Sequence, residues 1–560
     1  MLLPYHQLKY SYACKVLILI LCSAFTSTHQ ANAQSNDLLV EAEQAMLNAT
    51  KFMVDEVSYN GGYVWNYLPD FSRRWGEFEA FETMIWVQHP GTVSMAHTFL
   101  DAYELTGNEY YYKAAEKAVN ALIWGQSEYG GWHYMIDFAG DRSLKYWYNL
   151  DIGSALWGGQ EYHYYYGNDT FDDDVTSDAA RVILRIYLEN LDPKFKPSLD
   201  KAIDFILESQ YPLGGWPQRY PLRYDHVKKG IPDYSSYYTF NDDVIWENIN
   251  FLTQSYLTLG QERFLDPIRR GMQFYLLSLQ GNPQRGWGAQ HGMDLKPVQA
   301  RTFEPEALAP SYTVNNAMHL IRFYEWTGDR KFIAPIPDIL SWLEDARLPV
   351  EQTDNGRYTH PTWVEIGTGK PLYVHRRGSN RLHGEYYIDY SDEKLITHYG
   401  QKTNLESRIK TLRDEYQRVN AFSPDEATVN SPLKPSRFEG DEPESTPQNY
   451  YYLQGTSFDE IPTNSVASET LDDIPTDSEI KEIINALDEQ HRWLVMHART
   501  SQPFIGLEDA QEELTDEYCC AHPGDKTDTT AFNDPTDQDY ISTREYINNM
   551  NLLMKYIGSK

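Results

Sequence analysis

Apolar residues recur at intervals of three or four along much of the chain, which is the period of an α-helix with one buried face. The pattern predicts helices over residues 41–57, 92–105, 111–124, 178–190, 198–209, 242–259, 267–279, 334–344, 480–496 and 543–557. Alternating patterns typical of strands are sparse, and the best are at 362–366, 372–374 and 386–388. The chain is therefore expected to be mainly α, with a few short strands.

Five of these helices are followed by a glycine that has an aromatic residue one or two positions later. The glycines are Gly62, Gly131, Gly215, Gly286 and Gly356. A glycine after the last periodic residue is typical of a helix C-terminus. The steps between the glycines, about 70 to 84 residues, leave room for two helices and their loops. Helix pairs that recur in this way predict an (α/α) toroid or barrel, with an open solenoid as the alternative.

The two ends of the chain and one internal segment depart from this repeat. Residues 1–33 resemble a signal peptide, with Lys9, Lys15, an apolar run over 16–24 and a small-residue cleavage site at 31–33. Residues 421–479 are rich in Ser, Thr, Pro, Asp and Glu, and are expected to form a flexible acidic insertion. We therefore predict a secreted or periplasmic protein with a helical toroid over 34–420, completed by C-terminal helices in 480–560.

The formal net charge of −33 at pH 7 narrows the range of partners. Nucleic acids are bound by lysine and arginine, so a chain this acidic is not expected to bind them. Beyond the N-terminal run we find no apolar stretch that would cross a membrane. We also expect the protein to be a monomer. The overall field would also repel an acidic ligand, unless one cleft concentrates cations or a metal ion supplies the charge.

Asn241, Asp242 and Asp243 stand where a predicted helix begins. Acidic residues there favour capping and the helix dipole, which would explain one or two of them. Oxygen ligands at a loop-to-helix junction are also typical of a Ca²⁺ site. Asp242 and Asp243 are therefore candidate metal ligands.

Residues 286–304 follow neither a helical nor a strand period. Trp287, Gln290 and His291 lie in G-W-G-A-Q-H, and Arg301 and Glu304 follow them. An irregular stretch that combines these residue types is more typical of a site than of a core. Arg301 and Glu304 alone would equally suit a simple ion pair.

Further candidates are scattered along the chain. Arg376 and Arg377, together with Lys370, suit the binding of carboxylate or sulfate, although a solvated basic loop would have the same composition. His89, in W-V-Q-H-P-G just before a predicted helix, is the best histidine candidate outside the irregular stretch. Trp216 is a candidate for stacking on a sugar, with core packing as the alternative.

Several long motifs together resemble the polysaccharide lyase family 10 pectate lyases. The motifs are G-G-W-P-Q-R-Y-P (214–221), T-F-N-D-D-V (239–244), W-G-A-Q-H with A-R-T-F-E (287–304), E-I-G-T-G-K-P with R-R-G (365–378) and I-S-T with Y-I-N-N-M-N (541–551). The resemblance implies an (α/α) toroid, Ca²⁺-assisted elimination and a cleft lined by arginines. Asp243 would then lie at the sugar or calcium site, Arg301 would be the base, and Arg376 would bind a uronate carboxylate.

Three departures from the family pattern affect the expected substrate. Where the family has an aspartate in a D-N-G-A-T-T-T stretch, this chain has the residues that begin Gln88-His89-Pro90. Thr362 stands where the family has an arginine, and Gly292 where it has an aspartate. Fewer polar contacts to polygalacturonate would remain. His89 or His291 then becomes an alternative base, and ulvan or another algal uronate polymer an alternative substrate to pectate.

In the reaction that the resemblance implies, a base removes the C5 proton of a uronate and the group on C4 leaves. The adjacent carboxylate must be neutralised for this proton to become acidic enough. The expected function is a secreted polysaccharide lyase acting on an acidic polysaccharide. Two alternatives remain, an α/α-toroid hydrolase using a carboxylate pair such as Asp151 and Asp243, and a non-catalytic sugar-binding protein.

Overall fold

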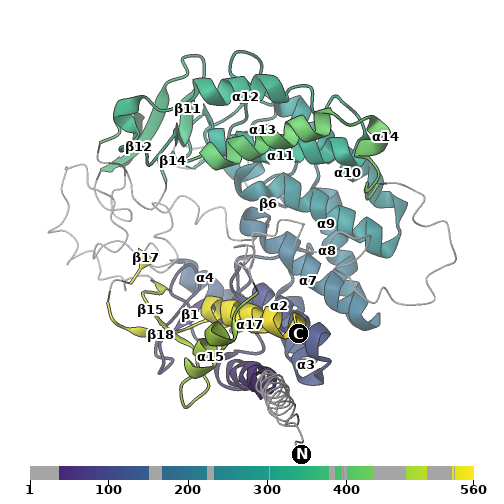
Figure 1. Cartoon of the computed structure of the whole chain (residues 1–560), viewed down its shortest axis with the longest axis vertical. Helices are drawn as coiled ribbons and strands as arrows, with labels where there is room; N and C mark the ends of the chain where they lie inside the picture. Colours follow the sequence, from purple (N-terminus) through teal and green to yellow (C-terminus); the bar gives the residue numbers. More distant parts are fainter. Residues whose placement is uncertain are drawn as a thin grey trace, which may run out of the picture.

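Consecutive helix pairs follow one another around an arc in the computed structural model of the chain (Figure 1). The structure describes residues 37–149, 167–222, 233–301, 303–377, 385–393, 395, 400–433, 474–500, 532–534 and 536–560. Four pairs are α2 (Thr92–Thr106) with α3 (Glu109–Gly125), α7 (Val175–Asn190) with α8 (Lys196–Ser209), α9 (Val244–Leu259) with α10 (Leu265–Ser278), and α11 (Pro310–Thr327) with α12 (Ile336–Asp345). We call the first helix of each pair the leading helix and the second the trailing helix. The predicted class, a mainly α toroid of helix pairs, is confirmed.

Each leading helix is preceded by a strand of two or three residues, which pairs with another short strand beyond the trailing helix. The antiparallel pairs are β3 (Met84–Trp86) with β4 (Met135–Asp137), β5 (Asp169–Thr170) with β6 (Arg219–Tyr220), β7 (Tyr238–Thr239) with β8 (Gln290–His291), and β9 (Ala307–Leu308) with β11 (Trp363–Glu365). The sheet of β9 and β11 continues into β12 (Pro371–Arg377) and β13 (Glu385–Asp389). The three predicted strands correspond to β11, β12 and β13.

The glycine–aromatic turns join each unit to the next. Tyr63, Trp132, Trp216 and Trp287 are buried, and their carbonyl oxygens accept hydrogen bonds from Trp86 (2.8 Å), Thr170 (2.9 Å), Thr239 (3.1 Å) and Ala309 (2.8 Å), close to the start of the following leading helix. Gly214 has a φ of +107°, and an added Cβ would lie 2.1 Å from the carbonyl oxygen of Arg270. Only glycine fits there. The repeat seen in the sequence is thus the repeat of the structure.

The two ends of the chain together make a fifth unit. The C-terminal helix α17 (Thr543–Gly558) follows β18 (Asp539–Ser542), which pairs with β1 (Asn66–Tyr67) just after the Gly62 turn. The N-terminal helix, residues 37–52, precedes that turn, and the hydroxyls of Thr50 and Tyr546 are 2.6 Å apart. The N-terminal helix is therefore the trailing helix of a unit whose leading helix is α17, and α17 packs on α2.

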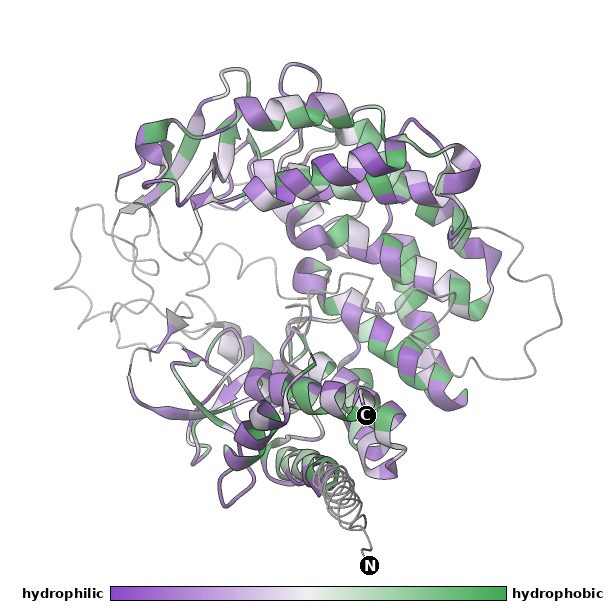
Figure 2. Ribbon diagram, viewed as in Figure 1, coloured by the Kyte–Doolittle hydropathy of each residue, from purple (hydrophilic) through white to green (hydrophobic). Residues whose placement is uncertain are grey.

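One continuous core runs through all five units. Figure 2 shows apolar and polar residues alternating along the helices, as expected of helices with one buried face. The main cluster of buried apolar side chains extends from Leu38 near the N-terminus to Tyr556 near the C-terminus. Within the described residues no helix is long and apolar enough to cross a membrane.

Two expectations about the C-terminal third need correction. The predicted helix over 480–496 is α15 (Asp477–Asn485) followed by the strand β15 (Leu494–Met496), because the pattern after Asn485 pairs with β18 instead. The expected insertion over 421–479 includes a short helix, α14 (Pro424–Ala427), whose first turn is capped by Ser423 and which packs on α11. Residues 434–473 of that insertion and the predicted signal peptide lie outside the described residues.

Candidate active site

Two turns with the same sequence pattern open the leading helices α7 and α9. Residues 170–175 read T-F-D-D-D-V, and residues 239–244 read T-F-N-D-D-V. The turns are η3 (Asp172–Asp174) and η5 (Asn241–Asp243), and the last two aspartates of each have left-handed backbone, with φ between 49° and 59°. Aspartate is one of the few residues other than glycine that adopt this conformation readily. The two turns are local copies of one another.

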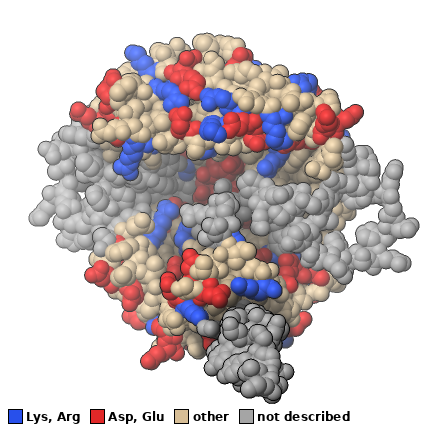
Figure 3. Space-filling model, in the orientation of Figure 1, with Lys and Arg blue, Asp and Glu red and all other residues tan. Residues whose placement is uncertain are grey.

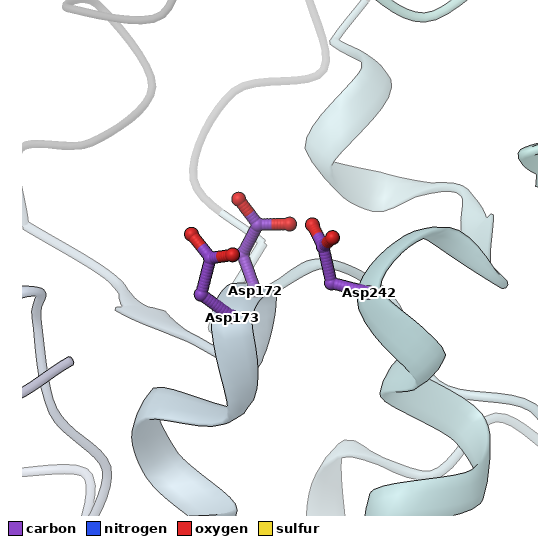
Figure 4. A group of neighbouring side chains, drawn as sticks. All are labelled: Asp172, Asp173 and Asp242. Carbon is purple, nitrogen blue, oxygen red and sulfur yellow. The ribbon is translucent and has the colours of Figure 1, made fainter. Parts of the chain in front are cut away.

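These turns bring three carboxylates together. Asp172, Asp173 and Asp242 each offer an oxygen, and the three oxygens lie within 4.8 Å of one another. Figure 4 shows Asp172 and Asp173 on one turn and Asp242 on the other, with their carboxylates in the same space. We call these three residues the carboxylate cluster. Asp242 was predicted as a metal ligand, whereas Asp172 and Asp173 were missed, although the second copy of T-F-x-D-D-V was visible in the sequence.

Neutral donors from neighbouring units surround the cluster. Asp172 accepts hydrogen bonds from the Tyr134 hydroxyl (2.5 Å), Gln218 Nε2 (2.7 Å) and Asn241 Nδ2 (3.2 Å). Asp173 accepts one from Gln88 Nε2 at 2.6 Å. Gln88 precedes α2, so the starts of three consecutive leading helices meet at this point. These bonds fix the carboxylates but supply no full positive charge.

The electrostatics of the cluster indicate a shortage of positive charge. Burial and repulsion from neighbouring carboxylates raise the pKa values of Asp173 and Asp242 well above the usual range. Burial also raises the pKa of Glu77 nearby. Burial acts in the same direction on Asp172, but Arg301 and the hydrogen bonds outweigh it and lower the pKa of that group. The cluster would therefore be stabilised in its ionised form by one more cation.

Arg301 is the buried cation beside the cluster. Its guanidinium Nη2 lies 2.8 Å from Glu304, and its Nη1 lies 3.9 Å from Asp172. Its side chain is only 6% exposed, so this is more than a surface ion pair. Figure 3 shows acidic residues at the bottom of a hollow between the two halves of the molecule, with basic residues on its rims. Arg301 thus forms the predicted ion pair with Glu304 and also lies beside the carboxylate cluster.

Asp243 lies outside the carboxylate cluster, in contrast to the prediction for it. Its carboxylate is 3.8 Å from Nε2 of His319 on α11. Asp243 follows Asp242 in its turn as Asp174 follows Asp173 in the other, and neither Asp243 nor Asp174 is among the three clustered carboxylates. The position that the prediction gave to Asp243 is filled by Asp172 and Asp173 from the other turn.

His291 is not placed to act as a base. The residue is fully buried, its Nε2 accepts from the backbone N–H of Gly288 at 3.0 Å, and its Nδ1 lies 2.9 Å from the carbonyl oxygen of Leu295. Burial lowers its pKa to about 4. With both ring nitrogens engaged, His291 holds together the turn that follows β8.

We expect His291→Asn to reduce the free energy of unfolding by about 2–4 kcal/mol, because buried partners lose their hydrogen bonds. Since burial lowers the pKa of His291 from its ordinary value of 6.5, the contribution of the imidazole to stability is present above pH 6.5 and lost as the pH falls towards 4. Urea unfolding at two pH values would measure both effects. His491→Asn is the matched control, because His491 is exposed and asparagine tolerates its left-handed backbone. If His291→Asn and the control reduce the free energy of unfolding equally, His291 has no structural role.

Trp216 and Trp287, predicted to contact a sugar, are part of the core. Both are fully buried, and their indole N–H groups donate to the carbonyl oxygens of Ile206 (2.8 Å) and Tyr275 (3.1 Å). Their rings have no face left for a ligand. Gln290 is also buried, and its amide makes no hydrogen bond within the described residues, so its predicted role in binding stays a prediction.

The remaining predicted residues are on the strands of the last unit or before α2. Arg376 and Arg377 are the last two residues of β12, and their side chains lie outside the described part. Lys370 is exposed before β12, with its Nζ 5.0 Å from the centre of the Tyr390 ring. His89 is largely buried, and its Nδ1 makes no hydrogen bond within the described residues. Asp151, half of the carboxylate pair of the hydrolase alternative, lies outside the described residues.

Comparison with known proteins gives one family match, over part of the chain. The model of the family described as "Pectic acid lyase" matches residues 146–361. The chain is similar to a family 10 polysaccharide lyase from Cellvibrio cellulosa, solved as a mutant in complex with trigalacturonic acid, at 16% identity over 57% of this chain and 98% of that one, with a TM-score of 0.39. It is also similar to cellobiose 2-epimerase from Spirochaeta thermophila, at 12% identity over 76% of this chain and 94% of that one, with a TM-score of 0.39. No curated protein matches.

The match over residues 146–361 confirms the resemblance seen in the motifs. Gln88 lies before the matched residues, whereas 170–176, T-F-D-D-D-V-T, lie within them and contribute two members of the carboxylate cluster. The matched residues thus include the acidic opening turn of α7 but not Gln88.

Proposed function

Because residues 146–361 match the pectic acid lyases, we propose that this protein cleaves a uronate-containing polysaccharide by β-elimination at the carboxylate cluster. The observation that carries the proposal is the arrangement of Asp172, Asp173 and Asp242 around one space with Arg301 beside them. A site built from acidic residues and one arginine is poorly suited to bind a sugar acid directly. It is well suited to do so together with a cation.

The donor atoms of the cluster fit a hard divalent cation such as Ca²⁺. All three are carboxylate oxygens, close enough together for a single ion, with neither sulfur nor imidazole among them. The raised pKa values of Asp173 and Asp242 are those of ligands without their counter-ion. A bound cation would neutralise the carboxylate of the uronate, which makes the adjacent C5 proton more acidic.

Arg301 provides the fixed positive charge of the site. Its guanidinium is held by Glu304 and lies close to Asp172, and an arginine stays protonated in a protein. The resemblance implies Arg301 as the base, but its geometry favours a different role. We assign it to stabilising the negative charge that develops on the uronate as the proton leaves.

The proton on C5 then needs another acceptor, and His89 is the candidate from the sequence. It follows Gln88, whose side chain contacts Asp173. Burial lowers the pKa of His89, which keeps the imidazole neutral and able to accept a proton near neutral pH.

Pectate is the first choice of substrate, with ulvan or another algal uronate polymer next, for a secreted or periplasmic monomer. The acidic residues at the bottom of the hollow in Figure 3 would repel any of these polymers in the absence of a cation. Cation binding and substrate binding are therefore coupled in this proposal.

The proposal is tested with pectate, ulvan, glucuronan and alginate, each with Ca²⁺ and with a chelator. We expect ultraviolet absorbance from a new conjugated double bond on at least one polymer, and a loss of more than about 100-fold with the chelator, because the uronate carboxylate would not be neutralised. New reducing ends without absorbance would point to a hydrolase, and binding without either product to a non-catalytic protein. Either result would refute the elimination.

A further inference from the structure

A second cavity lies along the same row of helix starts as the carboxylate cluster. It has a volume of about 260 Å³, and the residues that matter for its chemistry are Trp65, Asn66, His497, Arg499, Asn533 and Arg544. Trp65 and Asn66 are at β1, and Arg544 is the second residue of α17. The carboxylate cluster lies at the starts of α7 and α9, whereas this cavity lies at the start of α17, the leading helix of the fifth unit. We call it the Arg499 cavity.

Hydrogen bonds connect the wall of the Arg499 cavity to the carboxylate cluster. The indole N–H of Trp65 donates to the carbonyl oxygen of Gln88 at 3.1 Å, and Gln88 Nε2 donates to Asp173 at 2.6 Å. On the other side, Asn66 Nδ2 donates to the carbonyl oxygen of Arg499 at 2.8 Å. Only Trp65 and Gln88 therefore separate the cavity from Asp173 in this chain of contacts, so a polymer lying over the cluster would reach the cavity within a few sugar residues.

The charge of the cavity is opposite to that of the cluster. Where α7 and α9 open with pairs of aspartates, α17 opens with Thr543 and Arg544. Arg499 adds a second guanidinium, which lies 5.6 Å from the centre of the Trp65 ring and 3.9 Å from Glu77. The side chain of Arg499 is 48% exposed, so a ligand can reach its guanidinium without any rearrangement of the core. Glu545 also lines the cavity, and its carboxylate accepts a hydrogen bond from Asn549 at 3.1 Å.

We propose that the Arg499 cavity is a subsite for one acidic sugar residue of the polymer, a few residues away from the bond that is cut. The proposal rests on the proposed function and names a part of its substrate site that comes from outside the residues matched by the family. Guanidinium groups bind carboxylates by paired hydrogen bonds without a metal ion. The volume is just below the range of roughly 300–1,000 Å³ that is usual for ligand pockets, which suits one sugar ring rather than several. A subsite of this kind adds affinity for long chains and leaves the chemistry at the cluster unchanged.

The test compares oligogalacturonates and oligoglucuronates from the trimer to the octamer. For the wild-type protein, the dissociation constant is measured by calorimetry in Ca²⁺, and KM and kcat are measured by ultraviolet absorbance. We expect affinity to rise sharply at the length that first reaches the cavity. Arg499→Gln and Arg544→Gln should each weaken binding of the longer oligomers about 10-fold or more, with KM raised and kcat unchanged, and should leave the trimer unaffected. Arg499→Lys should restore part of the affinity.

Arg413→Gln is the matched control, because Arg413 on α13 (Glu406–Asn420) is an ion-paired arginine with a similar exposed fraction, 41%. Thermal unfolding checks that each variant is folded. Equal losses for Arg413→Gln would show a general effect of charge and would overturn the subsite. So would unchanged binding of long oligomers by both cavity variants, or losses that are the same for the trimer and the octamer. If the wild type makes no double bond but the cavity variants still bind long oligomers less tightly, the result would support the subsite and refute the proposed elimination.

Discussion

Asp173→Asn is expected to lower kcat/KM at least 1,000-fold and to make the protein without Ca²⁺ more stable. The first effect follows because a ligand of the proposed cation is lost, and with it the neutralisation of the uronate. The second follows because burial, Asp172 and Glu77 all raise the pKa of Asp173, so its ionised form destabilises the fold. Asparagine keeps the hydrogen bonding capacity and the left-handed backbone of this position. Activity and thermal unfolding in a chelator would measure the two effects.

The raised pKa of Asp173 fixes the direction in which the stability of the protein without Ca²⁺ changes with pH. A carboxyl group whose pKa is raised in the folded state contributes most to stability below its unfolded pKa, near 3.8, and that contribution is lost as the pH rises. The wild type without Ca²⁺ should therefore lose stability above that pH, and Asp173→Asn should lose less. Added Ca²⁺ should restore the stability of the wild type but not that of the variant. Asp173→Asn with wild-type activity, or with lower stability in the chelator, would contradict the assignment of this residue to a cation site.

Arg301→Ala is expected to abolish measurable lyase activity and to destabilise the protein by about 3–5 kcal/mol. The arginine is the buried partner of both Glu304 and Asp172, which are themselves 1% and 3% exposed in their side chains. Removal of one partner of a buried ion pair leaves an uncompensated charge in the interior. Urea unfolding measures the loss of stability, and ultraviolet absorbance of the digest measures the loss of elimination.

The double variant Arg301→Ala with Glu304→Gln separates stability from chemistry. Removing the second charge should recover much of the stability, because the glutamine needs no counter-charge. It should recover none of the activity, because the guanidinium that stabilises the charge developing on the uronate is absent. A double variant that regains both would show that Arg301 serves only to neutralise Glu304.

The fold was predictable because its signals are local and repeated. Each helix has an apolar face, and each trailing helix ends before a glycine such as Gly214, which no other residue can replace. The strand β15 was missed because its apolar residues, Leu494 to Met496, were read as a continuation of the helix that ends at Asn485. Its pairing with β18 depends on residues some 45 positions away.

The site was only partly predictable, because sequence shows residue types but not burial. Trp287 and His291 stand in a stretch without periodicity that looks like a site, yet both are buried and bonded within the protein. Asp172 and Asp173 were not singled out, because they precede the helix expected over 178–190, and only the second copy of their motif would have marked them. Arg499 belongs to no motif at all, and its place beside the cluster depends on how strands from the two ends of the chain pair.

The pairing of the chain ends has a consequence for anyone who wishes to produce a minimal catalytic fragment. The residues matched by the family, 146–361, would begin after α3 and would leave uncovered the surface of α7 on which α2 and α3 pack. They would also lack Gln88, which orients Asp173. Trimming the gene to the recognisable segment, or removing the N-terminal helix over 37–52 or α17, should therefore give an insoluble product, and expression tags belong after the exposed Lys560 rather than in place of α17.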